Sequence, residues 1–252
     1  MSLARADWVL GGIRWLGFGS TPARLETDVV VVSTHLDDVV FSLGAAISSA
    51  TRRRIHVAVL TVLAGDPDSI EPAGKWDADT GFRTAGEAAQ KRRDEDRRAC
   101  EILGAEPIWL PFSDQQYERG IDDAAARATL ARIAGERLVI GPGYPLINED
   151  HAWLARILVE TFEPDQLAFY LEQPYTALWT ESIARGCNQE GFVELGPWRR
   201  VDAGLRDRLR KTRACRAYRS QLPLLDPHTL RRLCSYEIRS GGERISWAFH
   251  AR

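Results

Sequence analysis

Stretches of apolar residues with strand-like spacing alternate with stretches of helical spacing along most of the chain. The run from Asp28 to Thr34 is β-branched and flanked by polar residues, which is typical of a strand buried on both faces of a parallel sheet. Four further strands are predicted at 55–63, 107–110, 137–140 and 166–171, and an edge strand is predicted at 244–249. Helices are predicted between and after them, at 39–50, 84–103, 121–134, 150–162 and 203–219.

This alternation predicts an α/β fold, a Rossmann-like doubly wound and mainly parallel sheet with helices on both faces. We expect residues 1–252 to form a single domain, because this length suits one large hydrophobic core. In such a sheet, ligands bind beyond the carboxyl ends of the strands, near the point where the strand order reverses. The site is therefore expected just after strand ends. A long Gly/Pro/Asp loop, from Ala64 to about Gly81, is also long enough to be functional.

Charge and cysteine content argue against a nucleic-acid-binding, secreted or membrane-spanning protein. Lys+Arg 33 and Asp+Glu 35 give a formal net charge of -2, so the chain has no global positive field for a nucleic acid. Residues 1–20 are too charged for a signal peptide or a membrane span, and we interpret them as a short amphipathic helix. Four scattered cysteines without a CxxC pair indicate reduced thiols. We therefore expect a cytoplasmic protein without a nucleic-acid partner, and the sequence leaves its oligomeric state open.

The motif with the clearest chemistry is His35-Leu36-Asp37-Asp38, directly between the first strand and the first helix. His35 and Asp38 are three residues apart across a turn, so their side chains can converge on one point while Asp37 faces another atom of the same site. One imidazole and one carboxylate make two of the three protein ligands of an open catalytic zinc site. The alternative is that Asp37 or Asp38 caps the helix and His35 is only structural.

A third ligand is expected after the strand at 137–140, the other strand that could flank the reversal of strand order. The loop there ends in Asn148-Glu149-Asp150-His151, with His151 at the start of a helix. Of the five histidines, only His35 and His151 directly follow predicted core strands. Asp150 either fixes a histidine tautomer or caps the helix, and the sequence leaves both roles open.

These residues resemble the zinc-dependent PIG-L/LmbE-type N-deacetylases, whose hallmark is a His-Pro-Asp-Asp motif and a later His-x-Asp-His. The resemblance covers about residues 28–221, with 1–27 as an N-terminal extension. It also includes Ser42-Leu43-Gly44, Thr61 to Pro67, Arg92-Arg93-Asp94-Glu95 and Tyr218-Arg219-Ser220-Gln221. The resemblance implies that His35, Asp38 and His151 hold Zn²⁺ and that Asp37 is the general base.

Three positions depart from the family pattern. Leu36 replaces the usual proline, and Val39 stands where a glutamate often follows the aspartates. Asn148 replaces the first histidine of the second motif, which is usually assigned to polarising the carbonyl or acting as an acid. Asparagine can donate a hydrogen bond but cannot supply a proton near pH 7. Either Asn148 is a neutral oxyanion donor, Tyr144 in the preceding loop takes over, or turnover is slow.

Candidate substrate-binding residues lie in the long loop beside the predicted metal, namely Asp66, Trp76, Asp77 and Phe82. An aromatic ring and carboxylates there could grip a sugar ring and its hydroxyls, and a solvated loop without such a role is the alternative. Arg92 and Glu95 are interpreted as a structural i, i+3 pair or as a tether between helix and core.

The resemblance implies a zinc-dependent hydrolase that removes an N-acetyl group from an amino sugar or amino-sugar conjugate. The departures at Leu36 and Asn148 favour a specialised natural-product pathway. One alternative is an amidase that cleaves a larger thiol or glycoside conjugate at the same metal. Another is a sugar- or nucleotide-binding relative that has lost turnover. Asn148 and Val39 favour the binding protein, whereas the intact ligand set and base favour the enzyme.

Overall fold

The computed structural model describes residues 28–117, 120–178, 194–225, 228–229, 231–233 and 242–249. In its central sheet, the eight described strands run in the order β3-β2-β1-β4-β5-β8-β6, and β7 also pairs with β8. The strands are β1 (Val29–Ser33), β2 (Val57–Thr61), β3 (Glu106–Trp109), β4 (Leu138–Tyr144), β5 (Leu167–Leu171), β6 (Glu194–Leu195), β7 (Arg199–Arg200) and β8 (Arg244–Phe249). β1 to β5 are parallel and β8 is antiparallel to β5, which confirms the predicted fold class.

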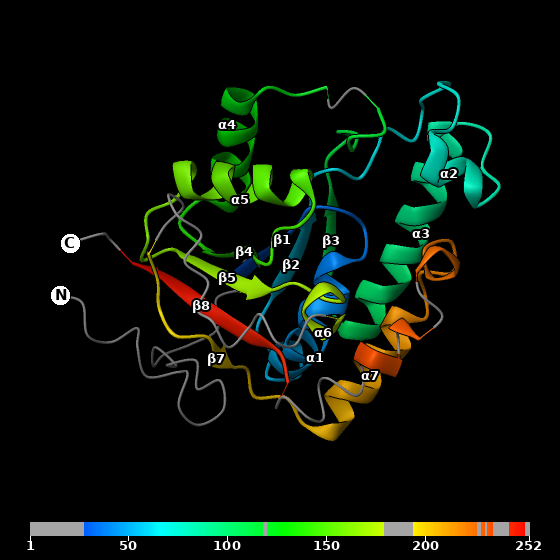
Figure 1. Ribbon diagram of the computed structural model, residues 1–252. Coiled ribbons are helices and arrows are strands. Elements are labelled where there is room, and N and C mark those ends of the chain that lie inside the picture. The colour runs from blue at the N-terminus through cyan, green and yellow to red at the C-terminus, as the bar shows by residue number, and fades with distance from the viewer. Residues whose placement is uncertain are drawn as a thin grey trace.

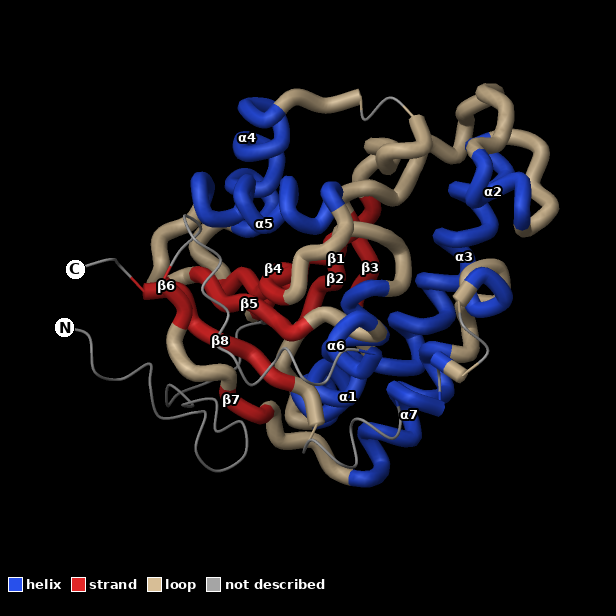
Figure 2. The backbone as a smooth tube through the Cα atoms, in the orientation of Figure 1, coloured by secondary structure: helices blue, strands red, loops and turns tan. Residues whose placement is uncertain are grey.

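Helices cover both faces of the sheet, with α4 and α5 on one face and α1, α3 and α7 on the other (Figure 1). The helices are α1 (Asp38–Arg52), α2 (Lys75–Asp79), α3 (Ala85–Leu103), α4 (Asp123–Ala134), α5 (Glu149–Thr161), α6 (Tyr175–Leu178) and α7 (Leu205–Cys215), with a 3-10 turn at Leu222–Leu224. The strands form one layer between the two helix groups (Figure 2). No helix in the described part of the chain is long and apolar enough to cross a membrane.

Alternate side chains of β1 enter two different hydrophobic cores. Val29 and Val31 belong to the core shared with α1, α3 and α7, whereas Val30 and Val32 belong to the core shared with α4 and α5. Because both faces are covered, every residue of β1 is buried, which explains its unbroken apolar run. β1 pairs with β2 on one side and β4 on the other, so the strand order reverses between β1 and β4. The carboxyl ends of these two strands therefore flank the expected ligand crevice.

β4 is longer than the sequence predicts. We expected the strand to end at Ile140, because the glycine/proline run at 141–143 is typical of a loop, but it continues to Tyr144. A Cβ atom at Gly141 would lie 2.1 Å from Leu158 of α5. The glycine is therefore explained by the close approach of a helix side chain to the strand rather than by a turn.

The last helix is shorter than predicted, and four small elements were missed. The helix expected at 203–219 ends at Cys215, because the chain then turns so that the Tyr218 hydroxyl can donate a 2.6 Å hydrogen bond to Asp96 of α3. α2, α6, β6 and β7 contain two to five residues each, which is too short for a hydrophobic period to be visible.

Some predictions concern residues that the structure does not describe. The amphipathic helix expected within 1–20 lies outside the described residues, as do Cys187 and Cys234. Cys100 and Cys215 are buried thiols, in keeping with the expectation of reduced cysteines.

Candidate active site

The first motif lies in a tight turn between β1 and α1. Asp38 is the first residue of α1, and its Oδ2 accepts a 2.8 Å hydrogen bond from the backbone N–H of His35. Asp37 occupies the N-cap position, but its side chain makes no capping hydrogen bond. The N–H of Val39 donates instead to the hydroxyl of Ser33, over 3.3 Å. Helix capping therefore does not account for Asp37, whose side chain lines a pocket.

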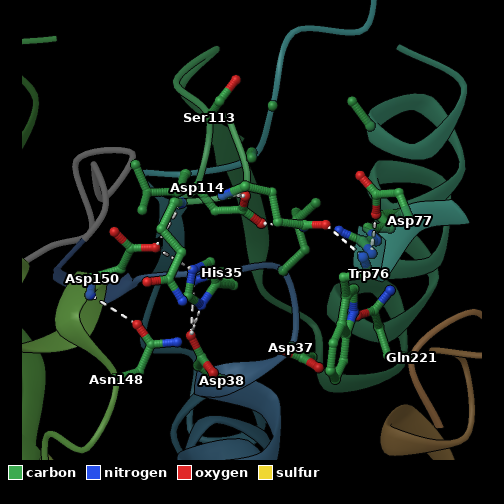
Figure 3. Close-up of a pocket in the computed structure, with 18 of the residues that line it drawn as sticks. His35, Asp37, Asp38, Trp76, Asp77, Ser113, Asp114, Asn148, Asp150 and Gln221 are labelled. Carbon is green, nitrogen blue, oxygen red and sulfur yellow. Dashed lines mark hydrogen bonds and ion pairs between the residues drawn. The ribbon is translucent and has the colours of Figure 1, made fainter. Parts of the chain in front are cut away.

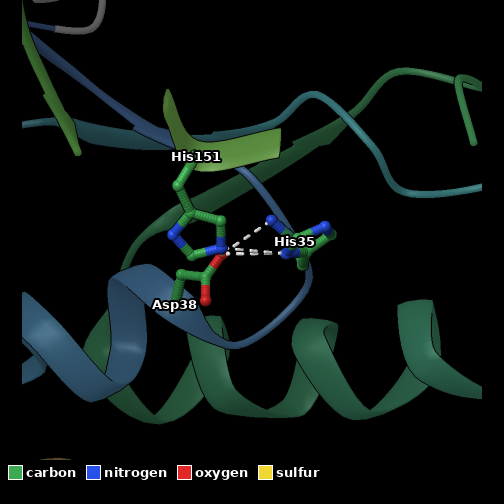
Figure 4. A group of neighbouring side chains, drawn as sticks. All are labelled: His35, Asp38 and His151. Carbon is green, nitrogen blue, oxygen red and sulfur yellow. Dashed lines mark hydrogen bonds and ion pairs between the residues drawn. The ribbon is translucent and has the colours of Figure 1, made fainter. Parts of the chain in front are cut away.

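His151 reaches the same point from α5, which begins beyond the carboxyl end of β4. Its Nε2 lies 3.1 Å from Nδ1 of His35 and 3.4 Å from Oδ2 of Asp38. The third side of this triangle, from Nδ1 of His35 to Oδ2 of Asp38, is 3.4 Å (Figure 4). The structure thus brings together the three residues that the sequence predicts as metal ligands.

This triangle has the size of one face of a zinc coordination tetrahedron. Bonds of about 2.0–2.1 Å from zinc to nitrogen or oxygen place neighbouring ligands about 3.3–3.4 Å apart. The observed separations of 3.1, 3.4 and 3.4 Å are close to that value. Two imidazoles and a carboxylate are also ligand types that zinc takes in catalytic sites, where a fourth position stays open for water or substrate. The residues present therefore fit a zinc ion.

Asp150 contacts the nitrogen of His35 that does not face the candidate metal position. Its Oδ2 lies 3.3 Å from Nε2 of His35 and accepts a 3.1 Å hydrogen bond from the backbone N–H of Gln115. The N-cap of α5 is Asn148, whose Oδ1 accepts a 2.8 Å hydrogen bond from the N–H of Asp150. Of the two roles left open for Asp150, the geometry favours orientation of His35 over helix capping.

Glu172 supports His151 in the same way, and sequence reasoning missed it. Glu172 directly follows β5, is buried, and accepts a hydrogen bond from Nδ1 of His151. Its other oxygen accepts a 2.9 Å hydrogen bond from the backbone N–H of Leu146. The bond to Nδ1 leaves Nε2 as the nitrogen that faces the metal position. In the sequence, Glu172 could have been noticed only as a single glutamate that follows an apolar strand, at the same edge of the sheet as both motifs.

The charged groups shift one another's pKa values. Burial lowers the pKa of His35, but hydrogen bonds to Asp150 and Asp38 outweigh it and raise the pKa to about 10. Burial raises the pKa of Asp37 to about 7, and the Asp38 carboxylate adds to the rise. Burial also acts to raise the pKa of Asp38, but His151 and His35 outweigh it and lower the value. The negative charge that favours protons on the histidines equally favours a bound cation.

A pocket of about 290 Å³ opens beside the three candidate ligands. Of the predicted substrate-binding residues, Asp66, Trp76 and Asp77 line it, together with Asn148, whereas Phe82 and Tyr144 are not among its lining residues. Figure 3 shows His35, Asp38, Asn148 and Asp150 on one side of this pocket and Trp76 and Asp77 on the other, with Asp37 between the two groups.

Hydrogen bonds hold the α2 region at the pocket. Asp77 forms an ion pair with Arg92 of α3 and accepts a 2.6 Å hydrogen bond from the hydroxyl of Tyr117. The indole Nε1 of Trp76 donates a 3.0 Å hydrogen bond to Oε1 of Gln221. These contacts hold the side chains of Trp76 and Asp77 at the pocket.

The C-terminal Tyr-x-Ser-Gln segment is anchored on α3. The hydroxyl of Ser220 donates a 2.7 Å hydrogen bond to Glu95, and Tyr218 contacts the neighbouring Asp96. Glu95 thus tethers the C-terminal segment and Arg92 tethers α2, so each binds a different partner. Of the two roles interpreted for Arg92 and Glu95, the geometry therefore favours tethers from α3 over a pair between the two residues.

The GlcNAc-PI de-N-acetylase family, PIG-L, matches residues 30–162, which is just over half of the chain. This chain belongs to the PIG-L family. The match confirms the resemblance found in the sequence and makes the chain a member of a family of hydrolytic N-deacetylases. No curated protein matches the chain.

Solved structures of PIG-L-like deacetylases share the fold. The A40926 pseudoaglycone deacetylase Dbv21 is 24% identical, with a TM-score of 0.74 over 88% of this chain and 96% of that one. The zinc-inhibited form of teicoplanin deacetylase Orf2 is 19% identical, with a TM-score of 0.71 over 87% and 97%. The N,N'-diacetylchitobiose deacetylase from Pyrococcus horikoshii is 18% identical, with a TM-score of 0.54 over 87% and 83%. At these identities, the likeness establishes the fold alone.

Proposed function

We propose that this PIG-L protein is a zinc-dependent hydrolase that removes an N-acetyl group from an amino sugar or amino-sugar conjugate, in a natural-product pathway. The observation that carries the proposal is the triangle of His35, Asp38 and His151. Next to it lies Asp37, whose carboxylate makes no helix-capping hydrogen bond. The names of similar structures, which include deacetylases of the antibiotics A40926 and teicoplanin, support the substrate class and the setting.

Each side chain at the site then has a chemical task. A zinc ion bound by His35, Asp38 and His151 would polarise the amide carbonyl and lower the pKa of water. Asp37 would take the proton of the attacking water and deliver it to the nitrogen, which must leave as a protonated amine.

Asn148 would act as a hydrogen-bond donor to the substrate. Its Oδ1 is engaged by the backbone N–H of Asp150, so the amide nitrogen is the end left for a ligand in the pocket. An amide N–H can stabilise a developing oxyanion but cannot supply a proton. The substitution of asparagine for the family histidine therefore leaves Asp37 as the proton donor to the amine.

The pocket also favours a substrate without negative charge. Six aspartates line it, against one arginine and no lysine among the described residues, and Arg92 is already paired with Asp77. Carboxylates such as Asp66 and Asp114 are suited to accept hydrogen bonds from sugar hydroxyls, and the indole of Trp76 offers a flat apolar face. A neutral acetamido sugar has the matching groups.

Purified protein assayed for zinc and for acetate release tests this proposal. We expect about one zinc per chain and acetate release from at least one member of a panel of neutral N-acetyl amino sugars and their conjugates. Zinc binding without release from any amide would favour a binding protein. Amine release only from bulky amides, without acetate, would favour the amidase. Either result would contradict the proposed deacetylation.

A further inference from the structure

The pocket contains a tyrosine hydroxyl that the fold does not use. Tyr175 of α6 lines the pocket, and no hydrogen bond joins its hydroxyl to any described residue. Tyr117 lines the same pocket, but its hydroxyl donates to Asp77 and accepts a 2.7 Å hydrogen bond from the N–H of Gly74. The hydroxyl of Tyr175 is thus available to a ligand, whereas that of Tyr117 serves the structure.

The turn that carries Tyr175 also holds His151. Glu172 binds Nδ1 of His151 with its side chain, and its backbone carbonyl accepts a 3.1 Å hydrogen bond from the N–H of Thr176. The N–H of Gln173 donates a 3.0 Å hydrogen bond to the hydroxyl of Ser42 in α1. The two residues at the start of this segment, Glu172 and Gln173, therefore anchor it to α5 and to α1.

The ring of Tyr175 lies against a candidate metal ligand. Its centroid is 6.0 Å from that of the His151 ring, with an angle of 78° between the ring planes. This edge-to-face contact restricts the ring, so that the hydroxyl needs little further ordering when a ligand binds. A fixed donor beside the metal position is what stabilisation of an oxyanion requires.

We propose that Tyr175 is a catalytic residue that donates a hydrogen bond to the carbonyl oxygen of the acyl group as negative charge develops on it. This inference rests on the proposed function. The phenol keeps its proton at neutral pH and forms no covalent bond, so it stabilises charge without taking part in proton transfer. It adds a second donor to the amide of Asn148. The sequence offered Tyr144 as an alternative to Asn148, but Tyr144 does not line the pocket.

The variant Tyr175→Phe keeps the ring against His151 and removes only the hydroxyl. We expect kcat for acetate release to fall by about 10²-fold or more, because one oxyanion donor is lost. KM should change less than threefold, and the zinc content per chain should stay the same. A kcat within twofold of the parent value would overturn the proposal.

Binding of inhibitors gives a readout that does not depend on turnover. Methylphosphonate carries tetrahedral oxyanions, whereas glucosamine has the sugar but no acyl oxygen. Tyr175→Phe should weaken methylphosphonate binding at least tenfold and leave glucosamine binding within twofold. Equal losses for both ligands would indicate a merely structural role and overturn the proposal.

Tyr170→Phe is the matched control. The Tyr170 hydroxyl donates a 3.3 Å hydrogen bond to the carbonyl of Val32 in the core and does not line the pocket. Its removal should leave kcat and methylphosphonate binding within twofold of the parent values. If the parent itself releases no acetate, the proposed function fails, whereas the methylphosphonate comparison still tests Tyr175 as an oxyanion donor.

Discussion

Glu172 accepts the Nδ1 hydrogen of His151 and thereby fixes which nitrogen of the imidazole faces His35 and Asp38. Its second oxygen accepts a 2.9 Å hydrogen bond from the N–H of Leu146, which ties the loop after β4 to the end of β5. The geometry of the candidate metal site therefore depends on a residue that lies in neither sequence motif.

Glu172→Gln should weaken zinc binding. Glutamine offers one acceptor oxygen, so the bonds to His151 and Leu146 cannot both be kept. We expect zinc affinity to fall about 10–100-fold, as for other carboxylates that orient metal-binding histidines. Competition with a fluorescent chelator measures it, and Glu163→Gln, at an exposed position, is the control. Parent-like affinity in Glu172→Gln would mean that Glu172 does not orient the ligand.

Asp37→Asn should separate catalysis from metal binding. Asparagine keeps the shape of the side chain but cannot take the proton of water, so acetate release should fall by about 10²–10⁴-fold. Zinc content should be unchanged, because Asp37 is not one of the three grouped ligand residues. His151→Ala should instead lose both zinc and activity. Parent-like turnover by Asp37→Asn would exclude Asp37 as the general base.

Substrate charge should affect the rate. Asp66 and Asp114, which are not among the three candidate ligands, line the pocket and repel an anionic group on the sugar, so kcat/KM for N-acetylglucosamine 1-phosphate should be at least tenfold below that for a neutral methyl glycoside of the same sugar. The ratio should shrink as salt is added, because ions screen the repulsion. Equal values at low salt would show that the acidic lining does not select the substrate.

Gly141→Ala should destabilise the fold. The added Cβ would lie 2.1 Å from Cδ1 of Leu158, so this buried side chain would have to leave its position and repack. We expect the free energy of unfolding to fall by about 1–3 kcal/mol, as for other overpacked cores. Denaturant unfolding measures it. Gly204→Ala is the control, since its nearest neighbour, Oδ2 of Asp207, would be 3.6 Å away. Equal stability of the two variants would argue against this packing.

Asp96 should make stability depend on pH. Burial raises the pKa of Asp96, against the opposing effect of hydrogen bonds from Tyr218 and Trp109. The folded state therefore holds this proton more tightly than the unfolded state. The contribution of this bound proton to the free energy of unfolding is complete below the ordinary aspartate pKa of about 4. It is lost as pH rises through the pKa of Asp96 in the folded state.

The difference in unfolding free energy between parent and Asp96→Asn isolates this effect. We expect the parent's advantage to shrink as pH rises from about 4 to 7, because only the parent must ionise a buried carboxyl. Asp94→Asn, on the exposed side of the same helix, controls for the change in charge. A parent advantage that grows with pH would contradict the raised pKa.

The order of strands and helices could be predicted because each element of the parallel core carries its own hydrophobic period. His35, Asp38 and His151 could be paired because the carboxyl ends of adjacent strands meet at one edge of the sheet. Each local motif thus contained the information needed to place its side chains.

Residues placed by long-range contacts could not be predicted in this way. Glu172 and Tyr175 follow β5 without a motif, and only the sheet brings them to His151. The extension of β4 through Gly141 depends on the approach of Leu158, which local propensity does not record. The role of such a single residue can be inferred only when its neighbours in the folded structure are known.

Anomalous X-ray diffraction at the zinc edge, from crystals of the zinc-loaded protein, tests the central claim most directly. We predict one strong peak about 2.0–2.1 Å from Nδ1 of His35, a carboxylate oxygen of Asp38 and Nε2 of His151. A peak at other residues, or no peak at these three side chains under saturating zinc, would contradict the account.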